Sequence, residues 1–184
     1  MQNSGEKKPK LLLHVCCAVC AVYVSKTLKS DFSLELFFYN PNIFPEREYQ
    51  KRLDEIKKIA KIYNLNLIIG EYKHSEWLKK IKGHEKDREG SERCEICYAL
   101  RIEKTALLAG KKGFDYFTTT LSVSPHKKSE IISKIGNNLS KKYKAVYLDK
   151  NFKKQDGFKK TMELSKDFDL YRQSYCGCEF SIRE

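Results

Sequence analysis

The sequence predicts an α/β protein built on one doubly wound parallel sheet of about five strands in the order 3-2-1-4-5. Three observations lead to this fold class. Short apolar runs of strand length alternate with longer segments that repeat apolar residues every three or four positions. The chain has 184 residues, which suits one compact domain. The sequence has no internal repeat, linker or low-complexity segment that would divide it.

The predicted strands are apolar runs bounded by turn residues, at positions 11–15, 34–39, 65–69, 114–119 and 145–148. The predicted helices cover positions 18–28, 45–63, 75–81, 96–108, 130–139 and 159–167. Asn40-Pro41-Asn42 has strong turn chemistry and ends the second strand. Pro45 suits the first position of the second helix. Residues 82–92 and 121–125 are predicted loops.

We expect a single domain over residues 1–184 with two distinctive ends. Residues 1–10 are polar and contain Gly5 and Pro9, so they are predicted to form a loose arm. Residues 170–184 form a tail that carries two cysteines and is expected to close a metal site.

The charge of the chain points to a polyanionic partner. Lys and Arg number 36 against 24 Asp and Glu, a net charge of +12 with a pI near 9.3. Half of this excess, a net +6, lies between Ser140 and Lys160, where aromatic residues are interleaved with the lysines. Nucleic acid is the commonest polyanion for such a pattern.

The N-terminal region superficially has the layout of a signal peptide, with Lys7, Lys8 and Lys10 before an apolar run. That run carries His14 and three cysteines, and it falls short of the roughly 20 residues that a membrane span needs. The other cysteines form short-range pairs, a spacing typical of metal or redox sites in a reducing compartment. We therefore expect a cytoplasmic protein without a membrane partner.

The seven cysteines occur in three clusters that the predicted fold brings together. Cys16, Cys17 and Cys20 follow the first strand, and ligands bind at the carboxyl ends of strands where the strand order reverses. Cys94 and Cys97 lie at a helix start, where the helix dipole favours thiolates. Cys176-Gly177-Cys178 forms a tight hook, and its glycine permits a close backbone approach.

This spacing alone leaves several kinds of site open. An iron–sulfur cluster takes four thiolates, and a structural zinc ion also takes four ligands. A thiol redox pair and incidental buried cysteines are the other readings, and Cys20 fits the last as a small hydrophobe. His14 lies within an apolar strand, so it is either a core histidine or a metal ligand. His74, His84 and His126 are interpreted as surface residues.

Five motifs, taken in order, match one known family. They are Leu12-Leu13-His14-Val15-Cys16-Cys17-Ala18-Val19-Cys20, Tyr39-Asn40-Pro41-Asn42-Ile43, Arg93-Cys94-Glu95-Ile96-Cys97-Tyr98-Ala99-Leu100-Arg101, the run 117–125 and the run 170–178. Over residues 11–181 the chain resembles the QueH-type epoxyqueuosine reductases, the cobalamin-independent class. Val19 departs from the family pattern, in which proline is expected, and should alter loop stiffness more than metal ligation.

The resemblance implies reduction of the epoxide of epoxyqueuosine, at the wobble position of certain tRNAs, to the alkene of queuosine. It also implies the adenine-nucleotide alpha hydrolase branch of Rossmann-like folds, with cysteines in place of a phosphate-cradling loop. Because no side chain supplies electrons, a redox cofactor is required, and we expect a 4Fe-4S cluster. The expected partners are tRNA carrying epoxyqueuosine and an external electron donor.

Residue roles follow from the resemblance as hypotheses. Cys94, Cys97, Cys176 and either Cys16 or Cys17 would hold the cluster. The remaining thiols, such as Cys178, would bind a second metal, a mononuclear iron or zinc, with a carboxylate or His14. The candidate catalytic residues are His14, Tyr175 and Asp156. The candidate contacts to RNA or substrate are Asn40, Asn42, Arg93, Arg101, Thr119, Lys153, Lys154, Tyr171 and Arg172.

Two other classes of protein compete with this interpretation. A zinc-stabilised RNA-binding module would explain the charge and most of the cysteines. An RNA-thiolation enzyme would share the fold, but it would need a loop for ATP. The sequence contains neither GxGxxG nor GxxxxGK[ST], and it lacks the GxSxG nucleophile elbow.

Overall fold

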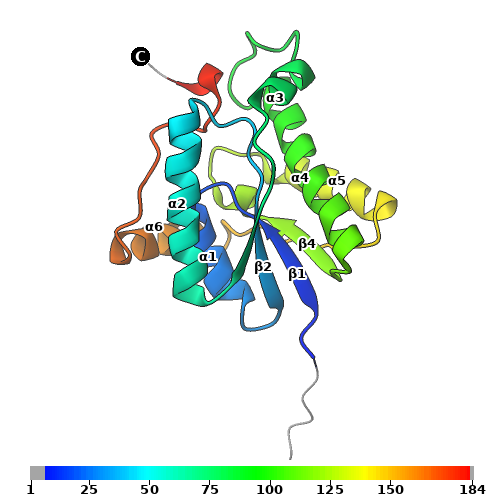
Figure 1. The fold of residues 1–184 in the computed structure, drawn as a ribbon, viewed down its shortest axis with the longest axis vertical. Coiled ribbons are helices and arrows are strands. Elements are labelled where there is room, and N and C mark those ends of the chain that lie inside the picture. Colours follow the sequence, from blue (N-terminus) through cyan, green and yellow to red (C-terminus); the bar gives the residue numbers. More distant parts are fainter. Residues whose placement is uncertain (1–6, 183–184) are drawn as a thin grey trace, which may run out of the picture.

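The fold is a single parallel sheet with helices on both faces, seen in a computed structural model that describes residues 7–182 (Figure 1). The strands are β1 (Lys10–His14), β2 (Ser33–Phe38), β3 (Asn66–Ile69), β4 (Tyr116–Thr119) and β5 (Val146–Tyr147). Their order is β3-β2-β1-β4-β5, and every pairing is parallel. The predicted fold class and strand order are confirmed.

The helices are α1 (Ala18–Leu28), α2 (Glu46–Tyr63), α3 (His74–Lys80), α4 (Glu92–Lys112), α5 (Ser129–Lys142) and α6 (Gly157–Asp167). Two short 3-10 helices, η1 (Thr120–Val123) and η2 (Glu179–Ser181), follow β4 and end the tail. One hydrophobic core joins α1, α2 and part of α6 to one face of the sheet, and a second joins α4 and α5 to the other.

β1 is the central strand of the sheet, and its apolar residues are continuous along the sequence rather than alternating with polar ones. Leu11 and Leu13 belong to the core beneath α1 and α2, whereas Leu12 belongs to the core beneath α4 and α5. All three side chains are fully buried. A strand covered on both faces reads as an uninterrupted apolar run, as parallel strands in doubly wound sheets do.

Several predicted boundaries are wrong, each for a local reason. The fourth helix is predicted at 96–108 but begins at Glu92. The N-cap is Ser91, whose backbone is extended and whose carbonyl accepts from the Cys94 amide, and the helix ends where Gly113 adopts φ 69°. Pro45 lies just outside α2, at the N-cap position. Lys10, predicted to be in the arm, is the first residue of β1, and residues 1–6 lie outside the described part of the chain. The predicted loop 121–125 is mostly the 3-10 helix η1, and the predicted strands 114–119 and 145–148 are shorter.

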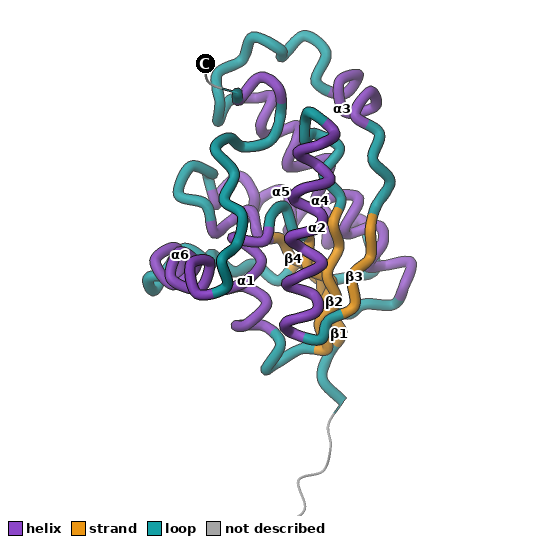
Figure 2. The backbone as a smooth tube through the Cα atoms, turned by 60° about the vertical axis from the view of Figure 1, so that its left-hand side comes forward, coloured by secondary structure: helices purple, strands orange, loops and turns teal. Residues whose placement is uncertain are grey.

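The C-terminal tail runs from α6 back alongside α2 to the end of the molecule that carries α3 (Figures 1 and 2). Arg52 on α2 holds it, donating from Nη1 to the Cys176 carbonyl (2.9 Å) and from Nη2 to the Tyr175 carbonyl (3.1 Å). The Nε of Arg52 donates to the Glu48 carboxylate at 2.7 Å, within a buried ion pair. Nearby, Tyr171 donates its hydroxyl to the same carboxylate at 3.0 Å.

Gly177 is the residue that lets the tail lie this close to the body of the protein. Its φ is 136°, a conformation that L side chains rarely adopt. A Cβ at this position would lie 3.0 Å from Arg52 Nη1 and 3.2 Å from Ile43. The close approach predicted for this glycine therefore occurs, against protein atoms of α2 and the loop after β2.

We predict that Arg52→Met frees the tail, because the substitution removes two hydrogen bonds to its backbone and leaves Glu48 buried without its cation. Breaking a buried pair should lower the free energy of unfolding by about 3 kcal/mol. Hydrogen exchange of residues 170–182 should accelerate, and denaturant unfolding gives the free energy. The control is Arg47→Met, at an exposed position on the same helix. Equal exchange in both variants would contradict the assignment.

Candidate metal centre

The carboxyl edge of the sheet gathers all seven cysteines, none of which is in a disulfide. Cys16, Cys17 and Cys20 lie in the turn after β1 and the first turn of α1, with Cys17 as the N-cap. Cys94 and Cys97 lie in the first two turns of α4, and Cys97 packs with Cys178 of the tail in a small core that contains Trp77. The convergence that the sequence predicts is confirmed.

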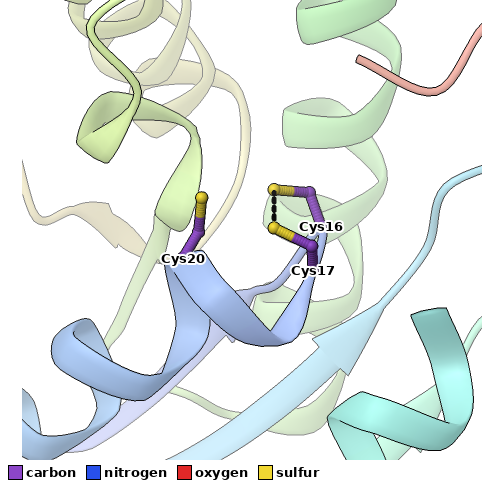
Figure 3. Close-up of side chains that lie close together, drawn as sticks. All are labelled: Cys16, Cys17 and Cys20. Carbon is purple, nitrogen blue, oxygen red and sulfur yellow. Dashed lines mark hydrogen bonds between the residues drawn. The ribbon is translucent and has the colours of Figure 1, made fainter. Parts of the chain in front are cut away.

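Cys16, Cys17 and Cys20 form the tightest group of thiols. Their three Sγ atoms lie within 4.8 Å of one another, and the Cys16–Cys17 distance is 3.9 Å (Figure 3). A tetrahedral ion with metal–sulfur bonds of about 2.3 Å holds its thiolates about 3.8 Å apart. The group we call the triad (Cys16, Cys17, Cys20) therefore has the spacing that one metal ion requires.

Within the triad, Cys16 is the thiol that ionises most readily. Hydrogen bonds from the thiols of Cys17 and Cys20 lower the pKa of Cys16 well below its usual value, and the charges of Lys127 and Arg101 act in the same direction. The hydrogen bond to Cys16 raises the pKa of Cys17 to about 12. Thiolates are the form that binds metal, so binding an ion here releases the protons of the other two thiols.

The other four cysteines, Cys94, Cys97, Cys176 and Cys178, form a second and wider group, which we call the quartet. Burial raises the pKa of Cys97 to about 11, and the nearby charges of Cys176 and Cys178 add to the increase. Burial also raises the pKa of Cys178, and the nearby charges of Cys176 and Cys94 act in the same direction. In the described chain, the triad is the one set of three or more cysteines with sulfur atoms within 4.8 Å. The quartet is therefore spaced more widely than a single ion needs, as suits a polynuclear cluster.

Arg101 of α4 lies between the two groups of thiols. It is buried, donates from Nε to the Cys97 carbonyl (3.2 Å) and donates from Nη1 to Asn40 Oδ1 (3.2 Å). Its buried Nη2 has no hydrogen-bond partner. Negative charge on Cys97 and Cys16 raises the pKa of Arg101 against the opposing effect of burial. An unpaired guanidinium N–H beside thiolates is suited to an anionic group with sulfur acceptors, so these residues fit an iron–sulfur cluster.

A pocket of about 490 Å³ opens beside the thiols. Cys20 and Cys176 line it from the triad and the quartet, and Lys127 lines it from the turn between η1 and α5. Phe158, Thr161 and Met162 of α6 form another wall. The tail adds Arg172, Gln173 and Tyr175, and the loop before α4 adds Glu89. A ligand in this pocket would contact both groups of thiols.

His14 has a structural role in this fold. Its Nε2 donates to the Tyr39 carbonyl (3.2 Å), and its Nδ1 accepts a hydrogen bond from the Thr119 hydroxyl (2.8 Å). Burial lowers the pKa of His14 to about 4, so the ring is neutral. Both nitrogens are occupied, which favours the core-histidine interpretation over a metal ligand or a proton donor. Thr119 donates its hydroxyl to His14 and accepts a hydrogen bond from the Leu121 amide, so both contacts lie within the fold.

The asparagines after β2 are buried near the thiols, as their position at the carboxyl edge predicts. Asn40 donates from Nδ2 to the Val15 carbonyl (2.9 Å) and accepts from Arg101, so it ties the end of β1 to α4. Asn42 is buried with its Oδ1 unpaired, close to Gly177. Direct contact of either residue with a substrate stays a prediction.

Several predicted RNA contacts have structural partners instead. Arg93 is buried, and its guanidinium donates to the carbonyls of His84, Glu85 and Asp87, which orders the loop before α4. Lys153 donates its ammonium to the Lys127 carbonyl at 2.8 Å. Tyr171 holds the tail on α2, with Lys51 3.5 Å from its ring centre. Their roles toward RNA stay predictions.

The remaining candidates differ in their access to the pocket. Tyr175 lines it and donates its hydroxyl to the Phe44 carbonyl. Arg172 lines it and is exposed, and Lys154 is exposed on the loop before α6. Asp156 is exposed at the N-cap of α6, outside the pocket lining. His84 and His126 lie near the surface as expected, whereas His74 is half-buried between the Pro41 carbonyl and Glu179, which corrects the prediction.

Sequence reasoning missed three residues of this centre. Cys20 packs against the core but also belongs to the triad, and its spacing three residues after Cys17 at a helix start is the available signal. Gln173 donates from Nε2 to Cys17 Sγ at 3.1 Å. Lys127 was one of many lysines, and no sequence signal separates it from the others.

The fold and the centre together define a class, a Rossmann-like α/β protein with a thiol metal centre at its switch point. Residues 11–184 match the family described as Epoxyqueuosine reductase QueH. A protein of that description from Streptococcus pyogenes serotype M1 is 35% identical over 182 residues, which cover 96% of this chain and 71% of the relative. Another, from Thermotoga maritima, is 41% identical over 177 residues, which cover 95% and 91%. The chain belongs to the epoxyqueuosine reductase QueH family.

A solved structure shares the fold at lower similarity. It is described as the U34-tRNA thiolase NcsA from Methanococcus maripaludis with its [4Fe-4S] cluster, and it has a TM-score of 0.59 at 12% identity. The match covers 97% of this chain and 63% of the thiolase, so this chain spans less than two thirds of that protein. None of the described helices of this chain has the length and apolar character that a bilayer crossing demands.

The division into triad and quartet predicts how the metal-free protein binds Co²⁺, which reports thiolate ligation by its visible absorption. Cys16→Ser and Cys20→Ser should weaken binding of one Co²⁺ at least about tenfold, because they remove ligands set at single-ion spacing. Cys94→Ser, in the quartet, is the matched control and should retain the bound Co²⁺. The reverse pattern would refute the division.

Proposed function

We propose that this protein reduces the epoxide of epoxyqueuosine in tRNA to the alkene of queuosine, with an iron–sulfur cluster as the electron source. The observation that carries the proposal is the pocket lined by thiols of both groups, in a chain of the epoxyqueuosine reductase family. A tRNA substrate and seven free thiols suit a cytoplasmic enzyme.

The quartet is the proposed holder of a [4Fe-4S] cluster. A protein of the same fold, the thiolase, is a precedent for a cluster of this type. The cluster would supply electrons one at a time, so an external one-electron donor must restore it after each transfer. The wider spacing of the quartet favours Cys178 as the fourth ligand, in place of the Cys16 or Cys17 that the sequence-based hypothesis assigned.

The triad is the proposed site of a second, mononuclear metal, for which we favour iron. Three protein thiolates leave one coordination position open, and catalytic metal sites keep such a position for substrate or water. Cys20 belongs to the triad and also lines the pocket, so that position is accessible to a ligand there.

The protein's own side chains support this centre. Arg101 can donate its free Nη2 hydrogen to an anionic acceptor, and Asn40 fixes the direction of its guanidinium. Trp77 and Ile81 pack over Cys97 and Cys178 and exclude water from that side. Thr120 supports Cys16, accepting a hydrogen bond from its amide at 3.4 Å.

The exposed cations beside the pocket are the proposed contacts to tRNA. Arg172 lines the pocket mouth, and Lys154 lies on the loop before α6 at the same edge of the sheet. RNA enzymes that act on a loop base splay it from its neighbours, while the backbone phosphates bind basic side chains. Phe158, half-exposed in the pocket wall, provides an aromatic face for the base.

Anaerobic reconstitution tests the cofactor assignment. The wild type should hold about four sulfides and about five irons per chain, since a cubane cluster has four of each. Cys97→Ser should lose the sulfide, whereas Cys20→Ser should lose about one iron and keep the sulfide, so each variant controls for the other. Stoichiometric zinc without acid-labile sulfide would refute the reductase proposal and favour a zinc-stabilised RNA-binding protein.

The tRNA surface is tested by charge reversal. Arg172→Glu with Lys154→Glu should weaken tRNA binding at least about tenfold and reduce the salt dependence by about two phosphate contacts. Lys26→Glu with Lys112→Glu makes the same charge change at the ends of α1 and α4, at the opposite edge of the sheet. Equal losses in both double variants would show that the tRNA senses net charge rather than this surface.

A further inference from the structure

Lys127 is a lysine of the pocket wall, beside thiols of both groups. It follows η1 in the turn before α5, at the carboxyl end of β4. It lines the same pocket as Cys20 and Cys176. Both polar groups of its backbone are hydrogen-bonded. Its N–H donates to the Ser124 carbonyl (3.3 Å), and its carbonyl accepts from Lys153 Nζ (2.8 Å).

The surroundings of the Lys127 ammonium come from both groups of thiols. Cys176 of the quartet and Cys20 of the triad line the pocket with Lys127. Burial opposes the charge of Lys127, and the charges of Cys176 and Cys16 act in the other direction and raise its pKa. Glu89, in the loop before α4, lines the same pocket. Lys127 therefore belongs to a polar pocket wall that thiols of both groups share.

The other cations near the centre are placed differently. Arg101 is buried and hydrogen-bonded to Asn40 and to the Cys97 carbonyl, outside the pocket lining. Arg172 lines the pocket but is exposed to solvent. Lys127 differs from both, because it is half-buried and lines the pocket beside Cys20 of the triad and Cys176 of the quartet.

The chemistry of the proposed function shows what such a cation would do. Reduction breaks both C–O bonds of the epoxide, forms the C=C bond, takes up two electrons and two protons, and releases one water. The electrons come from the proposed cluster and its external one-electron donor, and the protons come from water in the pocket. Negative charge develops on the oxygen as each C–O bond breaks, and a preorganised cation lowers that barrier.

We propose that Lys127 is a catalytic residue whose ammonium binds the epoxide oxygen of the substrate, and that Lys153 is the positioning residue for its loop. The inference rests on the proposed function and deepens it. Lys153 is also a candidate for binding RNA, and its ammonium donates a hydrogen bond to the carbonyl of Lys127.

The experiment uses the reconstituted full chain and compares Lys127→Met and Lys127→Arg with Lys128→Met, the neighbouring exposed lysine. Lys127→Met should lower kcat about 100-fold or more, the usual effect of removing a donor to a developing oxyanion, and Lys127→Arg should restore part of it. Iron content, sulfide content and the Kd for tRNA with queuosine, which lacks the epoxide oxygen, should match the wild type within about threefold. Lys128→Met should leave all four quantities unchanged.

A binding measurement separates this role from a purely structural one. A charged hydrogen bond to the epoxide oxygen should make the wild type prefer tRNA with epoxyqueuosine over tRNA with queuosine about tenfold or more. Lys127→Met should abolish this preference. Lys153→Met should lower kcat about tenfold by misplacing the loop, with tRNA affinity unchanged, and Lys153→Arg should restore it.

The outcomes distinguish the two proposals. A wild type with full iron and sulfide that does not reduce the epoxide overturns the proposed function, and the role of Lys127 falls with it. An active wild type together with a fully active Lys127→Met overturns the role of Lys127 alone. Loss of iron or sulfide in Lys127→Met also overturns it, in favour of cluster retention. A Kd for tRNA with queuosine that rises in step with the loss of kcat overturns it in favour of phosphate binding.

Discussion

The chain reverses its direction of winding between β1 and β4, and the thiol centre depends on this reversal. The two strands are neighbours in the sheet, yet α1 packs on one face after β1 and α5 packs on the other after β4. The loops that follow them therefore separate above the sheet and leave a crevice. Cys16 enters it from one side and Lys127 from the other, so a single topological feature brings together residues that are more than a hundred positions apart.

The crevice brings together thiols whose ionisation is opposed by burial and by the negative charge of their neighbours. Burial opposes ionisation of Cys97, and the nearby charges of Cys176 and Cys178 oppose it further. Arg101 and Lys127 offset these costs because both are cations on which the charges of nearby cysteines act. The centre is thus an electrostatic unit of thiols, the buried Arg101 and the half-buried Lys127. A metal or cluster would be stabilised by its ligands and by the positive charge placed around it.

The tail covers the thiol centre through hydrogen bonds to its backbone, whereas the core is held by apolar packing. The body of the protein reaches the tail backbone with the guanidinium of Arg52, whose second partner is the buried carboxylate of Glu48. Gly177 permits the approach because its backbone conformation excludes a Cβ. Cys176 and Cys178 flank this glycine, so two ligands of the proposed cluster depend on one ion pair of α2. Metal binding should in turn stabilise the tail, as ligand binding stabilises any folded segment it requires.

The sequence by itself determined the strand and helix order, the parallel sheet, the convergence of seven cysteines and the family resemblance. These depend on periodicity and on motif spacing, which act locally along the chain. Only the tertiary structure divided the thiols into triad and quartet, because sulfur–sulfur distances depend on how the turn after β1 meets α4 and the tail. It also showed that Lys153 and Arg93, which the sequence offers as contacts to RNA, donate hydrogen bonds to backbone carbonyls. Three-dimensional proximity decides which group a side chain contacts, and the identity of a residue as lysine or arginine does not reveal that group.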